Sequence, residues 1–305
     1  MAANRTYEFD VKDVEYLRHG NKPLLARIFQ PRGEGPFPGM IELHGGAWCN
    51  NDRTMDKTIN ETLAKSGVVV AALDFRMPPD AGYPGAMADI NYGIRWLKAH
   101  AAEYGTRADL VGISGNSSGA HQAMLVGMRP RDARYAAIAL PAGSPNVDAT
   151  VRCVMMFWPV IDPLGRYHYA KRLQAGPKPY PPIVDLVIPC HDKFWVSEDA
   201  MSEGSPMLAL ERGERAEMPP ALYLQGTEDV AHPREALDRF VAAYRKAGGH
   251  LELELYEGVA EGFINRKPEA KASAQALEKM VEFVHTQMPV TAEASAAAGS
   301  GCRRS

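Results

Sequence analysis

The sequence predicts an α/β fold with a mostly parallel central sheet and helices on both faces. Short apolar runs alternate along the chain with amphipathic stretches, and glycine-rich loops follow several of the apolar runs. Hydrophobic residues make up 46% of the 305 residues and charged residues 23%, the balance of a globular protein with a sizeable core. Strands that alternate with crossover helices form a parallel sheet covered on both sides.

The expected strands fall into two kinds. The first two segments alternate between apolar and polar residues, with the turn HGNKP between them. The later segments are short apolar runs such as GVVVAALDF, a composition typical of buried parallel strands. In chain order the expected strands are 6–17, 23–30, 38–46, 67–75, 108–115, 151–160, 220–226 and 251–258.

Helices are expected between these strands. Apolar residues recur at helical spacing from Met87 to Leu97. The segment 233–249 closes with two glycines, a common C-terminal stop. In chain order the expected helices are 57–65, 85–103, the stretch SSGAHQAMLVGM after residue 116, 233–249 and about 268–288.

Two segments do not fit this alternation of strands and helices. Residues 161–217 contain seven prolines and no long period, so we expect an insertion that forms a lid over the C-terminal edge of the sheet. Residues 289–305 are rich in alanine, serine and glycine, and we expect a disordered tail there. The chain is thus expected to form a single domain over residues 1–288, with the lid at about 161–217.

Charge and cysteine content exclude several classes of function. The net charge is −3, so no nucleic-acid partner is expected. The four cysteines, at 49, 153, 190 and 302, show no metal-ligand spacing, which favours reduced thiols. No signal peptide and no apolar run of the ~18 residues that a membrane helix needs are found. We expect a cytoplasmic protein with no membrane partner, no metal and no cofactor; the sequence does not indicate an oligomeric state.

The strongest motif is the run Gly115-Asn116-Ser117-Ser118-Gly119, which follows an expected strand and opens an expected helix. A sharp strand-to-helix turn requires small residues on both sides of its central serine. Such a turn exposes the serine hydroxyl at the C-terminal edge of the sheet, where α/β folds place their sites. Ser117 is therefore the candidate nucleophile.

A second glycine-rich loop, His44-Gly45-Gly46-Ala47-Trp48, also follows a strand directly. Glycines let backbone N–H groups point at a developing oxyanion. The expected donors are Gly45 and Gly46, together with the N–H of Ser118 after the nucleophile. His44 is expected to orient the loop.

These motifs, in this order, resemble the hormone-sensitive-lipase-like branch of the α/β-hydrolases, the acetyl esterase and carboxylesterase group. The resemblance covers about residues 35–288. It also includes DFRMPP at 74–79, YPGA at 83–86, Asp89 and Trp96, close to the family pattern DYRLAPE…PA…D…W. The family resemblance implies an α/β-hydrolase fold and a Ser–Asp–His triad in that chain order.

The resemblance assigns the acid but not the base. Gly226-Thr227-Glu228-Asp229 matches the family's G-x-x-D before a helix that begins with proline, so Asp229 is the expected acid. The family histidine follows the last strand as H-x-F or H-G-F. Here Glu261 stands in that place, before Gly262 and Phe263.

Two residues are therefore candidates for the base. Asp229 and Glu261 side by side would raise one of the two carboxyl pKa values. A Glu261 with a raised pKa would accept a proton from Ser117 or from a water, would protonate a leaving group, or would only hold Ser117 by a hydrogen bond. His232, three residues after Asp229 on the same loop, is the alternative base. His168 and His191 lie in the insertion, and the sequence does not place them.

The predicted function is a serine hydrolase of the carboxylesterase type. It would act on a small or aryl carboxylic ester through an acyl-Ser117 intermediate, with Glu261 in the usual place of the histidine. The alternatives are a non-hydrolytic dehydratase or lyase, a ligand-binding protein, or a catalytically impaired variant, natural or engineered. Aromatic residues of the insertion predict an apolar pocket, but not the natural substrate.

Overall fold

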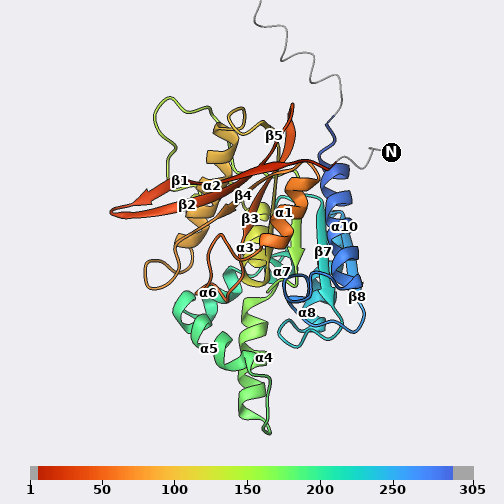
Figure 1. The fold of residues 1–305 in the computed structure, drawn as a ribbon. Coiled ribbons are helices and arrows are strands. Elements are labelled where there is room, and N and C mark those ends of the chain that lie inside the picture. The colour runs from red at the N-terminus through yellow and green to blue at the C-terminus, as the bar shows by residue number, and fades with distance from the viewer. Residues whose placement is uncertain (1–5, 291–305) are drawn as a thin grey trace, which may run out of the picture.

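In the described part of the chain, eight strands form one sheet, in the order β1-β2-β4-β3-β5-β6-β7-β8, with helices around it (Figure 1). The structure is a computed structural model, and it describes residues 6–290. The strands are β1 Phe9–His19, β2 Lys22–Pro31, β3 Phe37–Leu43, β4 Val69–Leu73, β5 Thr106–Asn116, β6 Val154–Phe157, β7 Ala221–Gly226 and β8 Leu251–Tyr256. The predicted tail lies, from residue 291 onward, outside the described residues.

Most of this sheet is parallel. β1 pairs antiparallel with β2, and β2 with β4, whereas every pair from β4 to β8 is parallel. Leu43 pairs with Gly115, so β3 and β5 end side by side; Gly226 pairs with Tyr256, so β7 and β8 do the same. The loops that carry the candidate residues therefore leave one edge of the sheet. The predicted α/β fold is confirmed.

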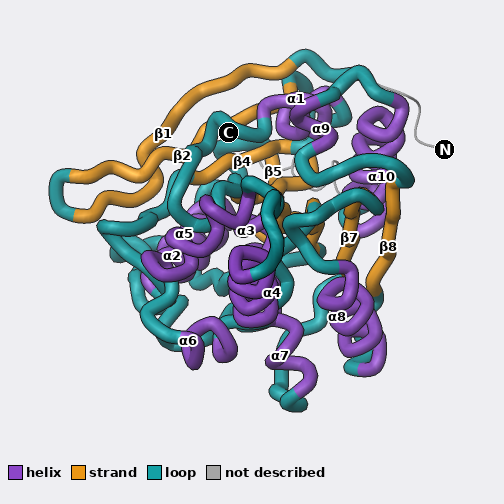
Figure 2. The backbone as a smooth tube through the Cα atoms, turned by 90° about the horizontal axis from the view of Figure 1, so that it is seen from below, coloured by secondary structure: helices purple, strands orange, loops and turns teal. Residues whose placement is uncertain are grey.

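Helices cover both faces of the sheet. The main ones are α1 Lys57–Lys65, α2 Gly85–Ala99, α3 Ser117–Met128, α8 Arg234–Lys246 and α10 Lys271–Gln287, with the short α9 Phe263–Arg266. α1, α9 and α10 lie together on one side, and α2, α3 and α8 lie on the other (Figure 2). The expected helix 85–103 ends at Ala99, four residues early.

The core consists of two apolar layers, one on each face. Successive strand residues point to opposite faces. Met155 therefore packs in the layer under α1 and α10, while Met156 packs in the layer under α2, α3 and α8. α8 contributes Leu237, Phe240 and Tyr244, which are buried at helical spacing.

The insertion folds into four helices: α4 Pro163–Ala175, α5 Ile183–Phe194, α6 Glu198–Glu203 and α7 Pro206–Glu211. The sequence alone did not predict them. Pro163 and Pro206 stand in the first turn, where proline is compatible with a helix because the missing N–H would be unpaired anyway. α4 projects away from the sheet (Figure 1). Among the described helices, none combines the length and apolarity needed to cross a membrane.

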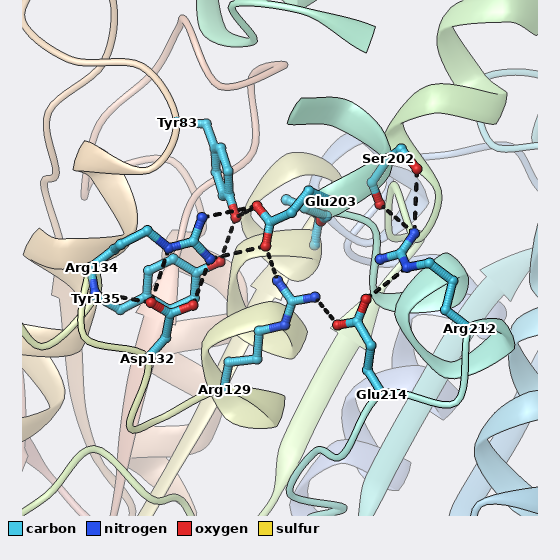
Figure 3. Close-up of polar contacts among 11 residues, drawn as sticks. Tyr83, Arg129, Asp132, Arg134, Tyr135, Ser202, Glu203, Arg212 and Glu214 are labelled. Atoms are coloured by element: carbon cyan, nitrogen blue, oxygen red, sulfur yellow. Dashed lines mark hydrogen bonds and ion pairs between the residues drawn. The ribbon is translucent and has the colours of Figure 1, made fainter. Parts of the chain in front are cut away.

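A polar network ties the second half of the insertion to the body of the protein (Figure 3). Its centre is Glu203 at the end of α6, which accepts hydrogen bonds from Tyr83, Arg129 and Arg134. Burial opposes the ionisation of Glu203, but the bonds from Arg134 and Tyr83 outweigh it and lower the pKa of this carboxyl. Arg129 also reaches Glu214, at 2.6 Å. The α6 end of the insertion is therefore anchored by several charges together.

Candidate active site

Ser117 stands on a strained turn between β5 and α3. Its φ is +48°, a value that residues other than glycine seldom adopt. A β-carbon on Gly119 would lie 2.1 Å from the carbonyl oxygen of Leu43, and one on Gly115 would lie 2.6 Å from the carbonyl carbon of Gly119. Both glycines are therefore required by close backbone packing. This is the geometry of a nucleophile elbow.

The side chain that contacts the Ser117 hydroxyl is His232. Ser117 Oγ lies 3.2 Å from His232 Nε2, within hydrogen-bond distance. His232 is only 2% exposed, and it lies on the loop between β7 and α8. Its carbonyl accepts a hydrogen bond of 2.9 Å from Gln225, which in turn accepts one of 3.1 Å from Tyr223. Two side chains of β7 thus support the loop that carries the imidazole.

Asp229 contacts the other nitrogen of the imidazole. His232 Nδ1 lies 2.9 Å from Asp229 Oδ2, and the N–H groups of Ala231 and His232 donate to Oδ1 at 2.9 and 3.0 Å. Burial opposes the ionisation of Asp229, but the charge and hydrogen bonds of His232 outweigh it and lower the pKa of this carboxyl. An ionised Asp229 keeps the proton on Nδ1. Nε2 is then free to accept the proton of Ser117.

Glu261 lies beside this acid–imidazole pair and not beside Ser117. Its Oε2 is 3.6 Å from His232 Nδ1, and its Oε1 is 3.4 Å from Arg266 Nη2. Within residues 6–290, no hydrogen bond joins Glu261 to Ser117. Of the two candidate bases, His232 is therefore the one in hydrogen-bond contact with Ser117, and the expected contact between Glu261 and Ser117 is not found within residues 6–290.

Three of these groups also have the spacing of a small cation site. Asp229, His232 and Glu261 offer ligand atoms that all lie within 4.8 Å of one another. The 2.9 Å contact between Asp229 and Nδ1 has the length of a charge-assisted hydrogen bond. A proton on Nδ1 accounts for it without an ion.

The glycine loop after β3 lies against the elbow. The N–H of Trp48 donates to Ser118 Oγ at 3.0 Å. Gly46 has a φ of +114°, and a β-carbon on Gly45 would lie 2.1 Å from Asn116 Oδ1. In the described part of the chain, no acceptor takes the N–H of Gly45, Gly46 or Ser118. The backbone donors on which the expected oxyanion hole depends are therefore unoccupied.

His44 braces this loop from inside. Its ring stacks on Phe75 with centroids 4.4 Å apart, and its Nδ1 lies 2.8 Å from the Gly45 carbonyl. Burial lowers the pKa of His44, so the ring is neutral at pH 7.

Three further histidines lie outside the contacts of Ser117. His121 is buried and lies between Trp48 Nε1, at 3.2 Å, and the Gly204 carbonyl, at 2.8 Å. Burial lowers its pKa to about 4. His168 pairs with Glu198 at 2.8 Å on the outside of the insertion. His191 is buried against Trp48, with ring centroids 4.9 Å apart.

The buried carboxyl group of Asp56 connects the elbow to α9. Asp56 accepts hydrogen bonds from Asn116, the residue before the nucleophile, and from Asn265 in α9. It also adjoins Glu42 of β3, and burial raises the pKa of both carboxyls. Asp56 thereby links the elbow to the segment that follows Glu261.

Two aromatic residues of the insertion, Phe194 and Trp195, pack against each other and against Trp48. Trp48 stacks on Phe194 with centroids 5.4 Å apart and meets Trp195 edge-on at 5.5 Å. Phe194 and Trp195 are both buried. Trp158, which precedes the insertion, packs against Phe263. A small cavity lies nearby, lined by His232, Pro233 and Ala236, by Tyr223, and by residues 159–162 and Arg166.

The sequence did not show which of the two candidate bases contacts Ser117; in the structure it is His232. Its signal was an aspartate followed three residues later by a histidine on one strand-end loop. The same spacing is common in capped loops that carry out no chemistry. Only the path of the loop turns the ring toward Ser117.

The sequence matches the BD-FAE family over residues 27–235 and the dienelactone hydrolase family over residues 204–288. It is similar to the probable carboxylic ester hydrolase LipM of Mycobacterium tuberculosis, with 26% identity over 251 residues, 79% of this chain and 53% of that protein. It is also similar to esterase LipC of the same organism, with 27% identity over 233 residues, 75% of this chain and 53% of that protein. The chain thus spans about half the length of these curated relatives.

Solved structures show the same fold. A hyperthermophilic esterase from the archaeon Pyrobaculum calidifontis superimposes with a TM-score of 0.75 at 21% identity, covering 93% of this chain and 85% of that one. Esterase LipW from Mycobacterium marinum gives a TM-score of 0.75 at 20% identity, covering 95% of this chain and 84% of that one. The architecture of the chain is that of these structures, the α/β-hydrolase fold.

Proposed function

This chain belongs to the BD-FAE family and has the α/β-hydrolase fold, and on that premise we propose that it is a carboxylic ester hydrolase with Ser117, His232 and Asp229 as its triad. One observation carries the proposal. The imidazole of His232 lies between Ser117 Oγ, at 3.2 Å, and Asp229 Oδ2, at 2.9 Å. The names of the curated relatives, an esterase and a probable carboxylic ester hydrolase, support the same reaction class.

In the first half of the reaction, Ser117 Oγ attacks the ester carbonyl as its proton passes to His232 Nε2. Asp229 stabilises the imidazolium that forms. The N–H groups of Gly45, Gly46 and Ser118 would stabilise the oxyanion of the tetrahedral intermediate. When the intermediate collapses, the C–O bond breaks and the alcohol leaves with the proton from Nε2.

In the second half, water hydrolyses the acyl-Ser117 ester. His232 removes a proton from the water and returns it to Ser117 Oγ as the carboxylic acid is released. Glu261 acts in this scheme as a second negative charge near Nδ1. It adds to the stabilisation of the imidazolium without contacting Ser117.

The alternatives to hydrolysis depended on a missing histidine. A dehydratase, a ligand-binding protein or an impaired variant would each explain an elbow serine without a base. His232 beside Ser117 removes that reason. The proposed substrates are small carboxylic esters, because Phe194 and Trp195 of the insertion are buried against Trp48.

Covalent labelling tests the nucleophile. A fluorophosphonate probe should label the wild-type protein, and Ser117→Ala should abolish labelling and hydrolysis of 4-nitrophenyl acetate together. Ser66→Ala is the matched control, because Ser66 caps α1 with a bond to the Leu63 carbonyl. Labelling that persists in a folded Ser117→Ala protein would overturn the assignment.

A further inference from the structure

Arg166 of α4 is a buried cation whose side chain has no hydrogen-bond or ion-pair partner among residues 6–290. It is 4% exposed, and its Nε and Nη1 atoms are buried without a hydrogen-bond acceptor. Within residues 6–290 its guanidinium forms no hydrogen bond and no ion pair. An arginine side chain stays protonated in proteins, and a buried charge without a partner costs folding free energy. The position of Arg166 therefore calls for an anion.

Arg166 lies close to the proposed triad. It lines the same small cavity as His232, together with residues 159–162 after β6. In that loop, the N–H of Val160 donates to the Ser117 carbonyl at 3.2 Å. The cavity is thus bounded by the base on one side and by a loop bonded to the nucleophile on the other.

The carboxylates that attract this guanidinium form no ion pair with it. Burial lowers the pKa of the Arg166 guanidinium to about 10, against the attraction of Glu261, Asp229 and Cys190. Asp229 already accepts three hydrogen bonds, from His232 and from two backbone N–H groups. Glu261 faces His232 and Arg266. Neither carboxylate lies within ion-pair distance of Arg166, so its donors stay free.

We propose that Arg166 binds a carboxylate group of the substrate, and that the natural substrates are half-esters of dicarboxylic acids. The planar guanidinium offers parallel N–H donors that match the two oxygens of a carboxylate. An acid group held there would lie on the same cavity as His232, and the ester of the same molecule would then extend past the imidazole toward Ser117. This inference rests on the proposed ester hydrolysis, and it specifies in addition that the substrate carries a negative charge.

A pair of substrates that differ only in charge tests the proposal. Monoethyl adipate carries one free carboxylate, whereas diethyl adipate carries none. We expect wild-type kcat/KM to favour the half-ester by at least about tenfold, since hydrogen bonds to charged groups are among the strongest in proteins. Arg166→Met should lose about 10- to 100-fold on monoethyl adipate and less than threefold on diethyl adipate. Arg166→Lys keeps the charge but lacks the planar guanidinium, so its kcat/KM on monoethyl adipate should lie between those of wild type and Arg166→Met.

Binding measured without turnover separates this proposal from the proposed function. Ser117→Ala should bind monoethyl adipate in calorimetry, and Ser117→Ala/Arg166→Met should not. If no ester is hydrolysed by wild type but this difference in binding remains, the esterase assignment fails and the carboxylate site stands. Equal treatment of the two adipate esters by wild type and by a folded Arg166→Met would overturn the carboxylate site. So would equal losses on both esters with a shifted pH profile, because Arg166 would then act through the triad charges.

Discussion

Replacing His232 tests whether the imidazole after β7 is the base. His232→Ala removes a side chain that is 2% exposed, and with it the contacts of 3.2 Å to Ser117 and 2.9 Å to Asp229. In subtilisin, loss of the histidine costs about 10⁶ in kcat, or ~8 kcal/mol of barrier. We expect kcat for 4-nitrophenyl acetate to fall by about 10⁴- to 10⁶-fold, because Glu261 has no contact with Ser117 through which to replace the imidazole.

A rescue at position 261 completes this experiment. His232→Ala/Glu261→His returns an imidazole to the loop after β8, where the family pattern places its histidine. The lost ring also leaves space between Asp229 and Ser117. We expect at least about a tenfold regain over His232→Ala, ~1.4 kcal/mol. Glu261→His alone should give no gain, because the His232 ring already fills that space.

The assay is steady-state ester hydrolysis, with thermal melts on the same samples to show that each variant is folded. His100→Ala serves as the control, because His100 bonds to the Trp96 carbonyl at the end of α2 and has no contact with the site. A folded His232→Ala protein that keeps more than a tenth of the wild-type kcat would refute the reasoning. A Glu261→Gln loss as large as that of His232→Ala would make the carboxylate the base.

Three further outcomes follow from the charges. Two unit charges 3.6 Å apart, the distance from Glu261 to His232, interact by ~1 kcal/mol in water and ~4–5 kcal/mol at an effective dielectric of 20. Since the Glu261 side chain is 22% exposed, Glu261→Gln should lower kcat/KM by about 5- to 30-fold in steady-state assays, and no change would deny it a role. Burial beside Asp56 raises the pKa of Glu42 and keeps this side chain protonated. Its contribution to folding stability is therefore fully present below pH ~4.3, the ordinary pKa of glutamate, and is lost as pH rises toward the raised pKa. The Tm of Glu42→Gln minus that of wild type should therefore grow from pH 4.5 upward, and a difference that is flat with pH would contradict this. Glu203→Ala, which leaves Arg129 and Arg134 without their shared acceptor, should lower the free energy of urea unfolding by about 1–3 kcal/mol, whereas Glu278→Ala on α10 should change it by less than about 0.5.

Most strands were predictable because the buried ones are short apolar runs, and all of these but β6 end in glycine or at a polar residue. β7 and the predicted segment 220–226 differ by one residue. The insertion was not predictable in the same way. Its helices bury side chains against one another and against Trp48, so no regular apolar face marks them in the sequence. α4, for example, buries Arg166 together with Tyr167 and Ala170.

The site was predictable where backbone geometry demands particular residues. Gly115 and Gly119 must be small because their neighbours approach within 2.1 to 2.8 Å of any β-carbon. No such backbone constraint fixes the position of the imidazole in the sequence, since a long side chain can reach Ser117 from more than one loop. The family pattern placed it after β8, where Glu261 stands. Which loop delivers the ring depends on tertiary packing, here on the support that Gln225 and Tyr223 give to His232.

The two hydrogen bonds of the His232 ring differ greatly in sequence range. The bond to Asp229 closes a loop of three residues, whereas the bond to Ser117 joins positions 115 residues apart. Closing a longer loop costs more chain entropy, although the cost grows slowly with length. The acid–base pair is therefore a local contact within the segment between β7 and α8. Its alignment with the nucleophile exists only while β5 and β7 stay docked through β6. Slight loosening of that part of the sheet would disconnect Ser117 while leaving the pair whole, so activity should be lost in mild denaturant before the global unfolding transition begins.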